Sequence, residues 1–354
     1  MTDDISEVLE NFNPEKKKSP ILSIGCDCGT MFIVLARSDS DEIKIIRNAY
    51  LSLDKEEISL SELIDINYVT SEDGDIYIIG EDAFKLANLF NKQISRPMEK
   101  GMISPKEVNA IDILTLMIKN LIGDIKGKDV YCSYSIPSAA IDEERSVVYH
   151  EKVFSMIFNS LGINSTSLNE AMSIIYSEAA KEKFSGVGIS FGAGMMNCCV
   201  AWRGIETVKF ATARSGDFID KSVAESLNII QNRVTSVKEK QFSLEIDYRK
   251  ESDKKKRRIM EALGYFYENL VNYTIKKIIK EFEDKVDIEI DEPIPIIVSG
   301  GTSMVPGFLN LFKSVIANYT LPFEVSEIRH AVDPLTAVAK GLLIKTISDV
   351  GDKK

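Results

Sequence analysis

The sequence predicts an α/β fold made of two similar halves that face each other across a cleft. Each half opens with a buried strand that ends in a glycine-rich turn, at residues 21–30 and again at 186–194. A hairpin, a helix and a further strand then follow in the same order in both halves, which indicates an internal duplication. Because ligands often bind where two lobes meet, we expect a binding site between the halves.

The elements of the first half follow from its apolar patterns. Runs of apolar and β-branched residues predict strands over 21–30, 31–38 and 43–53, as in an antiparallel meander. Helical periodicity predicts a helix over 104–123. A strand over 130–138 and a helix from about 141 to 161 complete this half.

The second half repeats this order with a longer helical region. Its predicted elements are strands over 186–194, 196–204 and 206–216, helices over 217–231 and 249–283, and a strand over 294–301. We therefore divide the chain between residues 165 and 166. The expected parts are a tail 1–19, a first lobe 20–165 with a small insertion at about 50–100, a second lobe 166–347 with a helical small subdomain at about 232–285, and a tail 348–354. A helix over 333–347 is expected to pack back on the first lobe.

Composition and charge narrow the classes of function. The chain has 354 residues, of which 44% are hydrophobic, enough for one large or two medium cores. Its net charge of -11 argues against nucleic acid as a direct partner, because neutralising phosphates needs a basic face. The two histidines have no neighbouring Ser/Asp or Cys constellation, which argues against histidine-driven nucleophilic catalysis.

The five cysteines lack the spacing of a disulfide scaffold, which predicts a reducing, cytoplasmic compartment. Cys26 and Cys28 would share one face of a strand, but no second Cys or His pair accompanies them, so zinc is disfavoured. Cys198 and Cys199 lie in an apolar strand, and we interpret them as small core residues.

The N-terminus is acidic and then basic, the reverse of a secretory signal, and no apolar run approaches the length of a membrane span. Ile5, Val8, Leu9 and Phe12 lie at helical spacing, and the opposite face is acidic. That charge argues against contact with an anionic membrane surface. We interpret the segment as a mobile tail or as a helix docked on a partner.

The two glycine turns are candidates for binding phosphate. "DCGT" (27–30) and "FGAG" (191–194) would each end a strand with exposed backbone N–H groups, which can form an anion nest. A divalent cation would then offset the phosphate charge, and Asp27 is placed to hold it directly or through water. Taken singly, either turn is equally well explained as a β-turn without a ligand.

A third glycine pair favours a nucleotide. In "SGG" (299–301), an adenine or ribose could lie against Gly300 and Gly301, where no Cβ blocks its approach. The same glycines lie between a buried strand and the next helix, so they also serve as the turn between these elements.

Eight segments, taken together and in order, resemble the actin-like ATPase superfamily, which includes actin, MreB, the heat-shock chaperone ATPase domains and sugar kinases. The segments are 25–30, 94–103, 136–148, 169–180, 191–194, 215–223, 298–308 and 333–343. The pattern is most similar to bacterial and archaeal actin homologues such as MreB, and it covers roughly residues 20–347. The resemblance implies duplicated ribonuclease-H-like domains of actin type, two lobes around a nucleotide cleft, ATP or ADP as the ligand, and Mg2+.

The resemblance also implies roles for individual residues. Asp27 would organise the metal ion, and Glu170 would position or polarise the attacking water. Without the resemblance, Glu170 would be interpreted as a helix-start carboxylate favoured by the helix dipole. The implied nucleotide contacts are Gly25, Asp27, Cys28, Gly29 and Thr30 in the first turn, Gly192, Ala193 and Gly194 in the second, Gly216 and Asp217 near the sugar, and Gly300, Gly301, Thr302 and Met304 around adenosine. Contacts to the base from the small lobe of the second half are expected within 232–242.

Two positions depart from the family pattern. Ser190 stands where the second phosphate loop usually has Asp, and Met195 follows the loop where Thr or Ser is common. A serine cannot supply charge to a hydrated cation, which predicts weaker metal affinity and slower hydrolysis. The sequence therefore supports nucleotide binding more strongly than fast turnover.

Two functions remain open. We expect an actin-like protein that assembles head to tail into filaments under ATP control and recruits cargo or adaptor proteins. The alternative is an actin-fold adaptor or pseudo-ATPase that binds ATP and recruits partners without polymerising. A chaperone or a sugar kinase is disfavoured, because the sequence offers neither a peptide-binding domain nor a base for a sugar hydroxyl. The basic cluster "DKKKRR" (253–258) is either a solvated helix face or an interface with an acidic partner or filament neighbour.

Overall fold

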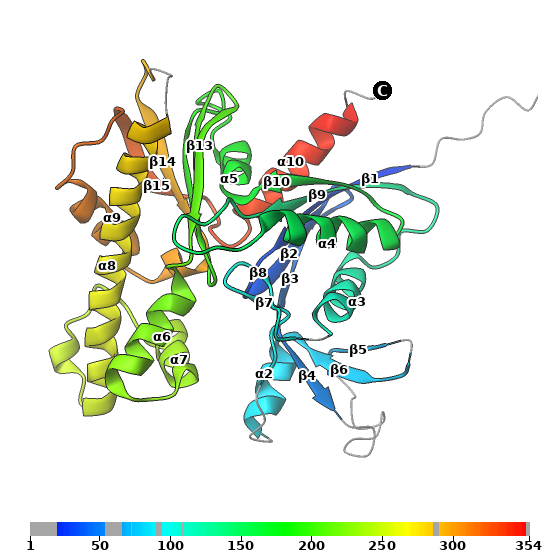
Figure 1. Ribbon diagram of the computed structural model, residues 1–354, viewed down its shortest axis with the longest axis horizontal. Helices are drawn as coiled ribbons and strands as arrows, with labels where there is room; N and C mark the ends of the chain where they lie inside the picture. The colour runs from blue at the N-terminus through cyan, green and yellow to red at the C-terminus, as the bar shows by residue number, and fades with distance from the viewer. Residues whose placement is uncertain are drawn as a thin grey trace, which may run out of the picture.

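The computed structural model describes residues 20–53, 66–71, 73–89, 94–107, 109–285 and 290–351. The predicted N-terminal helical segment lies outside these residues. The described chain forms two lobes, each built on a five-stranded sheet, and they stand side by side in Figure 1. Among the helices in these ranges, none combines the length and the apolar character that a membrane span requires.

The sheet of the first lobe has the strand order β10-β9-β1-β2-β3. Its strands are β1 (Ile21–Cys28), β2 (Phe32–Arg37), β3 (Ser40–Arg47), β9 (Asp129–Ile136) and β10 (Asn164–Asn169). The first three strands form an antiparallel meander, whereas β9 runs parallel to β1, and β10 runs parallel to β9.

The sheet of the second lobe repeats this topology, with the strand order β13-β12-β11-β14-β15. Its strands are β11 (Gly186–Phe191), β12 (Met196–Trp202), β13 (Ile205–Thr212), β14 (Ile294–Ser299) and β15 (Val325–His330). Again three antiparallel strands are followed by two parallel additions. The prediction of a duplicated, two-lobed α/β fold is therefore confirmed.

Two helices pack between the sheets, α5 (Glu170–Glu178) and α10 (Ala337–Gly351). Helix α10 contacts α5, β1 and β9, although it follows the second lobe in sequence. The opposite face of the first sheet is covered by α3 (Ala110–Ile122) and α4 (Val147–Ser160). The outer face of the second sheet is covered by α6 (Gly216–Leu227), α8 (Lys254–Lys285) and α9 (Phe308–Ile316).

Each lobe carries a smaller part at the lower end of Figure 1. In the first lobe it consists of β4 (Tyr50–Leu53), β5 (Tyr68–Thr70), β6 (Ile76–Ile79) and α2 (Gly80–Leu89). In the second lobe, α7 (Gln231–Lys240) and η2 (Tyr248–Lys250) lie beside α6 and the first turns of α8. A short hairpin, β7 (Met98–Glu99) and β8 (Met102–Ile103), reaches from the first lobe toward the second.

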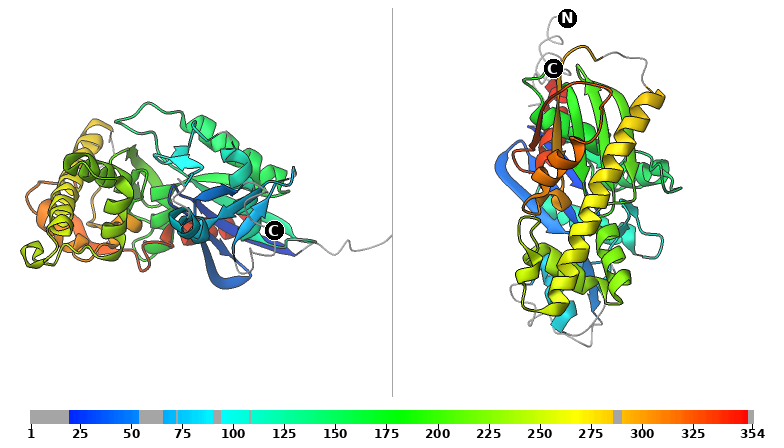
Figure 2. Two further views of the ribbon diagram at one scale, coloured as in Figure 1. Left: turned by 90° about the horizontal axis from the view of Figure 1, so that it is seen from below. Right: turned by 90° about the vertical axis from the view of Figure 1, so that its left-hand side faces the viewer.

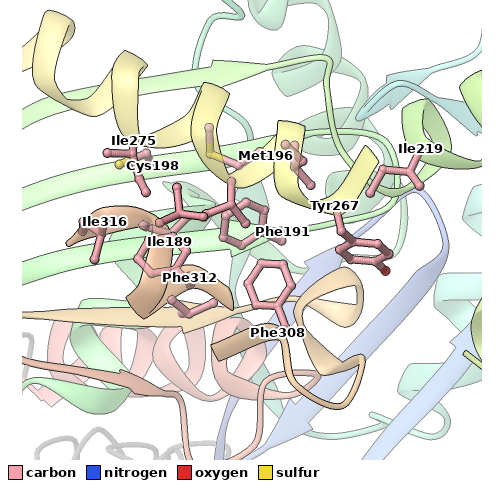
Figure 3. Packing of buried hydrophobic residues seen from close by; sticks show 14 of the residues in the cluster. Ile189, Phe191, Met196, Cys198, Ile219, Tyr267, Ile275, Phe308, Phe312 and Ile316 are labelled. Atoms are coloured by element: carbon pink, nitrogen blue, oxygen red, sulfur yellow. The ribbon is translucent and has the colours of Figure 1, made fainter. Parts of the chain in front are cut away.

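The core of the second lobe is rich in aromatic side chains (Figure 3). Phe191 at the end of β11 lies edge-on against Phe308, with 5.1 Å between ring centroids, and Tyr267 of α8 meets Phe308 at 6.0 Å. Edge-to-face contacts of this kind add to the free energy gained from burying the rings. They fix the end of β11, which leads directly into the second glycine turn.

Several predicted boundaries were wrong because tertiary contacts interrupt the local pattern. The predicted strand 43–53 is two strands in different sheets, since Asn48 turns the chain by bonding Met31 and Gly29. The helix predicted from about 141 begins at Val147, because Ile141 instead donates its backbone N–H to Ala211 of the second lobe.

Two more helices are shorter than predicted, and the last helix has its predicted length but lies four residues further along the chain, ending at Gly351. The helix predicted over 104–123 begins at Ala110, after β8 and a turn, and the helix predicted over 217–231 ends at Leu227. The helix predicted from 333 begins at Ala337, because the Asp333 side chain accepts bonds from Leu335 and Thr336 and forms a turn first. The division predicted between 165 and 166 falls inside β10, and since this strand pairs with β9, we propose that the second lobe begins after Asn169.

Two glycines allow α10 to approach its neighbours closely. A Cβ on Gly341 would overlap the carbonyl oxygen of Ser173 in α5, and a Cβ on Gly25 would overlap the backbone of α10 at Ala339 and Leu343. Neither overlap involves the flexible end of a side chain. The junction between the lobes is therefore set by backbone-to-backbone contact.

We predict that Gly341→Ala lowers the free energy of unfolding by about 3 kcal/mol or more, at the upper end of the cost of overpacking. The added methyl group must push α10 away from α5, because the backbone of Ser173 cannot yield. Urea unfolding followed by circular dichroism measures the change. Gly351→Ala is the matched control, since nothing lies within 4 Å of its Cβ, and an equal loss in both variants would contradict the prediction.

Candidate functional site

A cavity lies where the ends of β1 and β11 meet between the lobes. Its walls come from both glycine turns, from the starts of α5 and α10, and from the β14 turn. Ten of the predicted site residues line it: Asp27, Cys28, Gly29, Thr30, Glu170, Gly192, Ala193, Gly194, Gly300 and Gly301. Segments that are far apart in the sequence therefore converge on one space.

The first turn is held by contacts from β9 and β7–β8. The Ser135 hydroxyl donates to Asp27 Oδ1 at 2.8 Å and accepts the backbone N–H of Cys28 at 2.8 Å. Thr30 Oγ1 accepts the backbone N–H of Gly101 at 2.9 Å. These bonds fix both the carboxylate and the loop backbone that face the cavity.

The second turn is anchored through one carbonyl oxygen. Gly192 O accepts hydrogen bonds from Ser215 Oγ at 2.6 Å, Thr302 Oγ1 at 2.7 Å and the backbone N–H of Gly216 at 3.2 Å. The backbone N–H of Asp217 also donates to Ala193 O at 2.8 Å. The carbonyl side of the turn is thus tied into its own lobe, away from the cavity.

The two turns approach each other at Gly194. A Cβ at this position would overlap Gly101 N and lie 2.5 Å from Thr30 Oγ1. Met195 packs against Gly101, so the second turn lies directly against the hairpin of the first lobe. Only glycine fits at position 194 while the lobes hold this arrangement.

Glu170 begins α5 and faces the same cavity. The Asn169 side chain caps the helix by accepting the N–H groups of Ala171 and Met172, each at 3.1 Å. Asn197 Nδ2 donates to Glu170 Oε2 at 2.8 Å, while Asn197 Oδ1 accepts the backbone N–H of Ser138 at 3.0 Å. Asn197 therefore orients the Glu170 carboxylate, and the bond from Ser138 of the first lobe fixes the orientation of the Asn197 amide.

The cavity holds two carboxylates in a poorly solvated place. Burial is the main cause that raises the pKa of Glu170 well above its usual range, and the charge of Asp27 adds to it. Burial also raises the pKa of Asp27, which its hydrogen bond from Ser135 offsets in part. Uncompensated negative charge of this kind favours a cation or a proton at the site.

Five predicted site residues lie elsewhere. Gly25 faces α10, so its lack of a side chain serves helix packing. Gly216 and Thr302 lie behind the second turn and bond to it, Asp217 points toward the first lobe, and Met304 is 50% exposed.

Gly300 lines the cavity, but its φ of 89° and its contact with the Phe191 backbone already require glycine; Gly301 has open space around it.

Sequence reasoning missed three residues of the site, Ser135, Gly101 and Asn197. Ser135 and Gly101 lie on segments that only the folded sheet and hairpin bring to the first turn. Asn197 had a local signal, since it follows the second turn by three residues on a buried strand, where a polar side chain needs a partner.

The cavity is narrow, and two ion pairs join the lobes in its neighbourhood. It encloses about 70 Å3, less than a ligand pocket of ordinary size. Arg96 pairs with Asp217 at 3.1 Å, and Arg47 pairs with Glu239 at 3.4 Å, both from the first lobe to the second. In the arrangement of the lobes that the structure shows, this volume is too small for a nucleotide.

The family model of volactin matches residues 22–346. The chain belongs to the volactin family. No curated protein matches it in sequence. Its fold is that of actin-like proteins and resembles MreB.

Solved structures show the same fold at low identity. A MamK double helical filament is 15% identical, with a TM-score of 0.68, over 91% of this chain and 97% of that one. MreB5 of Spiroplasma citri bound to AMPPNP is 15% identical, with a TM-score of 0.66, over 96% and 99%. The ethanolamine utilization protein EutJ from Carboxydothermus hydrogenoformans is 16% identical, with a TM-score of 0.52, over 95% and 93%.

We predict that Glu170→Gln stabilises this volactin family member at pH 8 by more than about 1 kcal/mol, and has little effect near pH 4. A carboxyl whose pKa is raised in the folded state holds its proton longer than in the unfolded state. Its contribution to stability is therefore lost as pH rises above the unfolded pKa. Urea unfolding at both pH values measures this; Glu283→Gln, at an exposed carboxylate, is the control, and a gain independent of pH would refute the explanation.

We predict that Arg96→Gln loosens the contact between the lobes. Loss of this pair should speed amide hydrogen exchange in residues 98–103 several-fold, as expected for about 1 kcal/mol of a half-buried ion pair. Mass spectrometry of the exchanged peptides measures the rate. Lys85→Gln, which breaks the pair of an exposed lysine within α2, should leave exchange unchanged, and equal effects of the two variants would contradict the prediction.

Proposed function

We propose that this protein is a nucleotide-binding cytoskeletal protein that assembles into head-to-tail filaments under ATP control. The observation that carries the proposal is the pair of glycine turns, one from each lobe, which enclose two buried carboxylates. Backbone N–H groups from two facing turns suit a phosphate chain. A ligand held by both lobes also joins them, and so controls the shape of the molecule.

The residues present fit a magnesium ion bound together with phosphate. Across the described ranges, no group of three or more His, Cys, Asp or Glu side chains could hold a metal by itself. Asp27 would supply one oxygen directly or through water, and phosphate and water would supply the rest, as is usual for Mg2+. The positive charge would relieve the repulsion between Asp27 and Glu170.

The other contacts would come from residues around the cavity. Gly301, with open space beside it, would face adenosine together with Gly300, and the 232–242 segment would approach the base. Gly216 and Thr302 would act indirectly, by fixing the second turn through the Gly192 carbonyl. Asp217 would contact the sugar only after Arg96 has released it.

Hydrolysis would be slow. Glu170, oriented by Asn197, would position the attacking water and accept its proton. Ser190 lines the cavity at a position where the actin-like ATPase superfamily, which the sequence resembles, usually has a second metal-binding carboxylate. Charge stabilisation during hydrolysis would therefore be weaker. We therefore expect long-lived filaments in the cytoplasm, whose partners are other copies of the chain and cargo or adaptor proteins.

The structural neighbours support assembly and nucleotide binding. The MamK structure is a double helical filament, and structures of MreB5 contain AMPPNP or ADP. Closure of the two lobes on ATP would align their surfaces, and head-to-tail contacts would then continue without closing into a ring.

Two observations favour a second candidate function. Ser190 lacks the charge expected of a fast ATPase, and Met195 is buried against the hairpin of the first lobe. An actin-fold adaptor that binds ATP without polymerising would need neither fast hydrolysis nor a changing cleft. It would differ from the filament protein in whether it assembles.

We predict that the protein pellets at high speed with Mg-ATP above a critical concentration, and pellets less with Mg-ADP or no nucleotide. Glu170→Gln should lower phosphate release at least about tenfold and increase the pelleted fraction. Sedimentation and a phosphate assay measure the two effects. A protein that binds ATP but stays in the supernatant at every concentration would establish the adaptor function instead.

A further inference from the structure

Helix α8 carries opposite charges at its two ends. The helix has 32 residues, which corresponds to about 48 Å. It runs the length of the second lobe, from the small helical subdomain to the far edge of the sheet (Figure 1 and Figure 2). Its first five residues, Lys254 to Arg258, are all basic, whereas Glu283 and Asp284 lie in its last turn.

This distribution opposes the helix dipole. The positive end of the dipole is at the N-terminus, so basic residues there and acidic residues at the C-terminus both destabilise the helix. The helix gains nothing within its own chain from this arrangement. The stability of α8 therefore does not explain the charges at its two ends.

The basic end, defined by Lys254, Lys255, Arg257 and Arg258, has charge left over after its internal pairs. Within the described residues, these four cations make no ion pair, because the nearby Glu251 pairs with Lys256 at 2.7 Å and Asp247 pairs with Arg249 at 2.8 Å. Asp253 is used as a cap that accepts the backbone N–H groups of Lys255 and Lys256.

The acidic end, defined by Glu283, Asp284, Asp291 and Glu324, is its counterpart. All four are exposed, and none has an ion-pair partner in the part of the chain that the structure describes. Glu324 lies beside β14 because Ile294 donates its backbone N–H to Glu324 O. Lys276 and Lys280 lie on α8 one to two turns further back, and Lys285 ends the helix after Asp284, so the four carboxylates outnumber the lysine at this edge.

An exposed apolar residue accompanies each charged end. Ile246, 44% exposed, lies in the loop beside the start of α8, and Ile205, 66% exposed, lies on the β12–β13 hairpin next to Arg203. Arg203 pairs with Glu292, so this hairpin borders the acidic end. Apolar contact within a charged rim is the usual composition of a protein interface.

We propose that the basic end of α8 binds the acidic end of α8 in a second copy of this chain. The two charge sets are complementary and lie at opposite ends of one lobe, so the contact is heterologous and repeats in an open line. This inference rests on the proposed filament function and assigns its longitudinal contact to named residues. An anionic surface at the basic end is the competing explanation.

Charge reversal at either end tests the contact. One variant carries Lys254→Glu, Lys255→Glu and Arg258→Glu, and the other carries Glu283→Lys, Asp284→Lys and Asp291→Lys. Each variant alone should raise the critical concentration at least about tenfold, because like charges then meet. An equimolar mixture should pellet again as an alternating copolymer, since each reversed end then finds an opposite charge.

The controls separate this inference from the proposed function. Lys119→Glu with Lys126→Glu reverses exposed charges on the first lobe and should leave the critical concentration unchanged. Wild-type assembly should also weaken as salt rises from about 0.05 M to about 0.5 M, because the contact is screened. If wild type assembles and either variant assembles equally well, the inference fails while the filament function stands.

The mixture of the two variants tests the contact even if wild type does not assemble. The proposed function would then fail, but at low salt analytical ultracentrifugation should still show reversible association of wild type and of the mixed variants, and none of either variant alone. A mixture that stays monomeric would overturn the contact. Pelleting of wild type with anionic vesicles, lost only in the basic-end variant while the mixture shows no association, would favour a surface partner instead.

Discussion

The close packing of α10 against both lobes is the constraint on which the rest of the structure depends. Gly341 lets α10 touch the backbone of α5, and Gly25 lets β1 touch α10. Helix α10 thus lies on the first sheet although the chain reaches it from the second. This contact holds the ends of β1 and β11 near each other, so the two glycine turns can share one cavity.

The chemistry of the cavity follows from that proximity. Each lobe by itself would present one turn and at most one carboxylate to solvent. Brought together, the turns shield Asp27 and Glu170 from water, and this burial is what raises their pKa values. The proposed site would therefore combine backbone donors for anions with carboxylates that favour a cation, as a metal-bound polyphosphate would use.

The sequence allowed prediction of the duplicated sheets and of ten residues that line the cavity, because strand patterns and glycine turns are local signals. The features that could not be predicted from the sequence depend on long-range contacts. Asn48 ends β3 through bonds to Met31 and Gly29, and Ser135 reaches Asp27 only after β9 has paired with β1. Gly25 was expected at the ligand, but alternation along β1 turns it toward α10. A glycine in a sequence motif can therefore serve either ligand binding or close packing, and only the folded structure shows which of the two applies.

The three hydrogen bonds on Gly192 O have a mechanical consequence. The second turn is tied to α6 and to the β14 turn, so it moves with its own lobe as one rigid piece. The first turn is tied instead to the β7–β8 hairpin. The two turns face each other across the cavity, and the ion pairs of Arg96 and Arg47 hold the two lobes together. Rotation of whole lobes would open the cavity and leave each glycine turn intact, so both turns could bind the same ligand again when the lobes close.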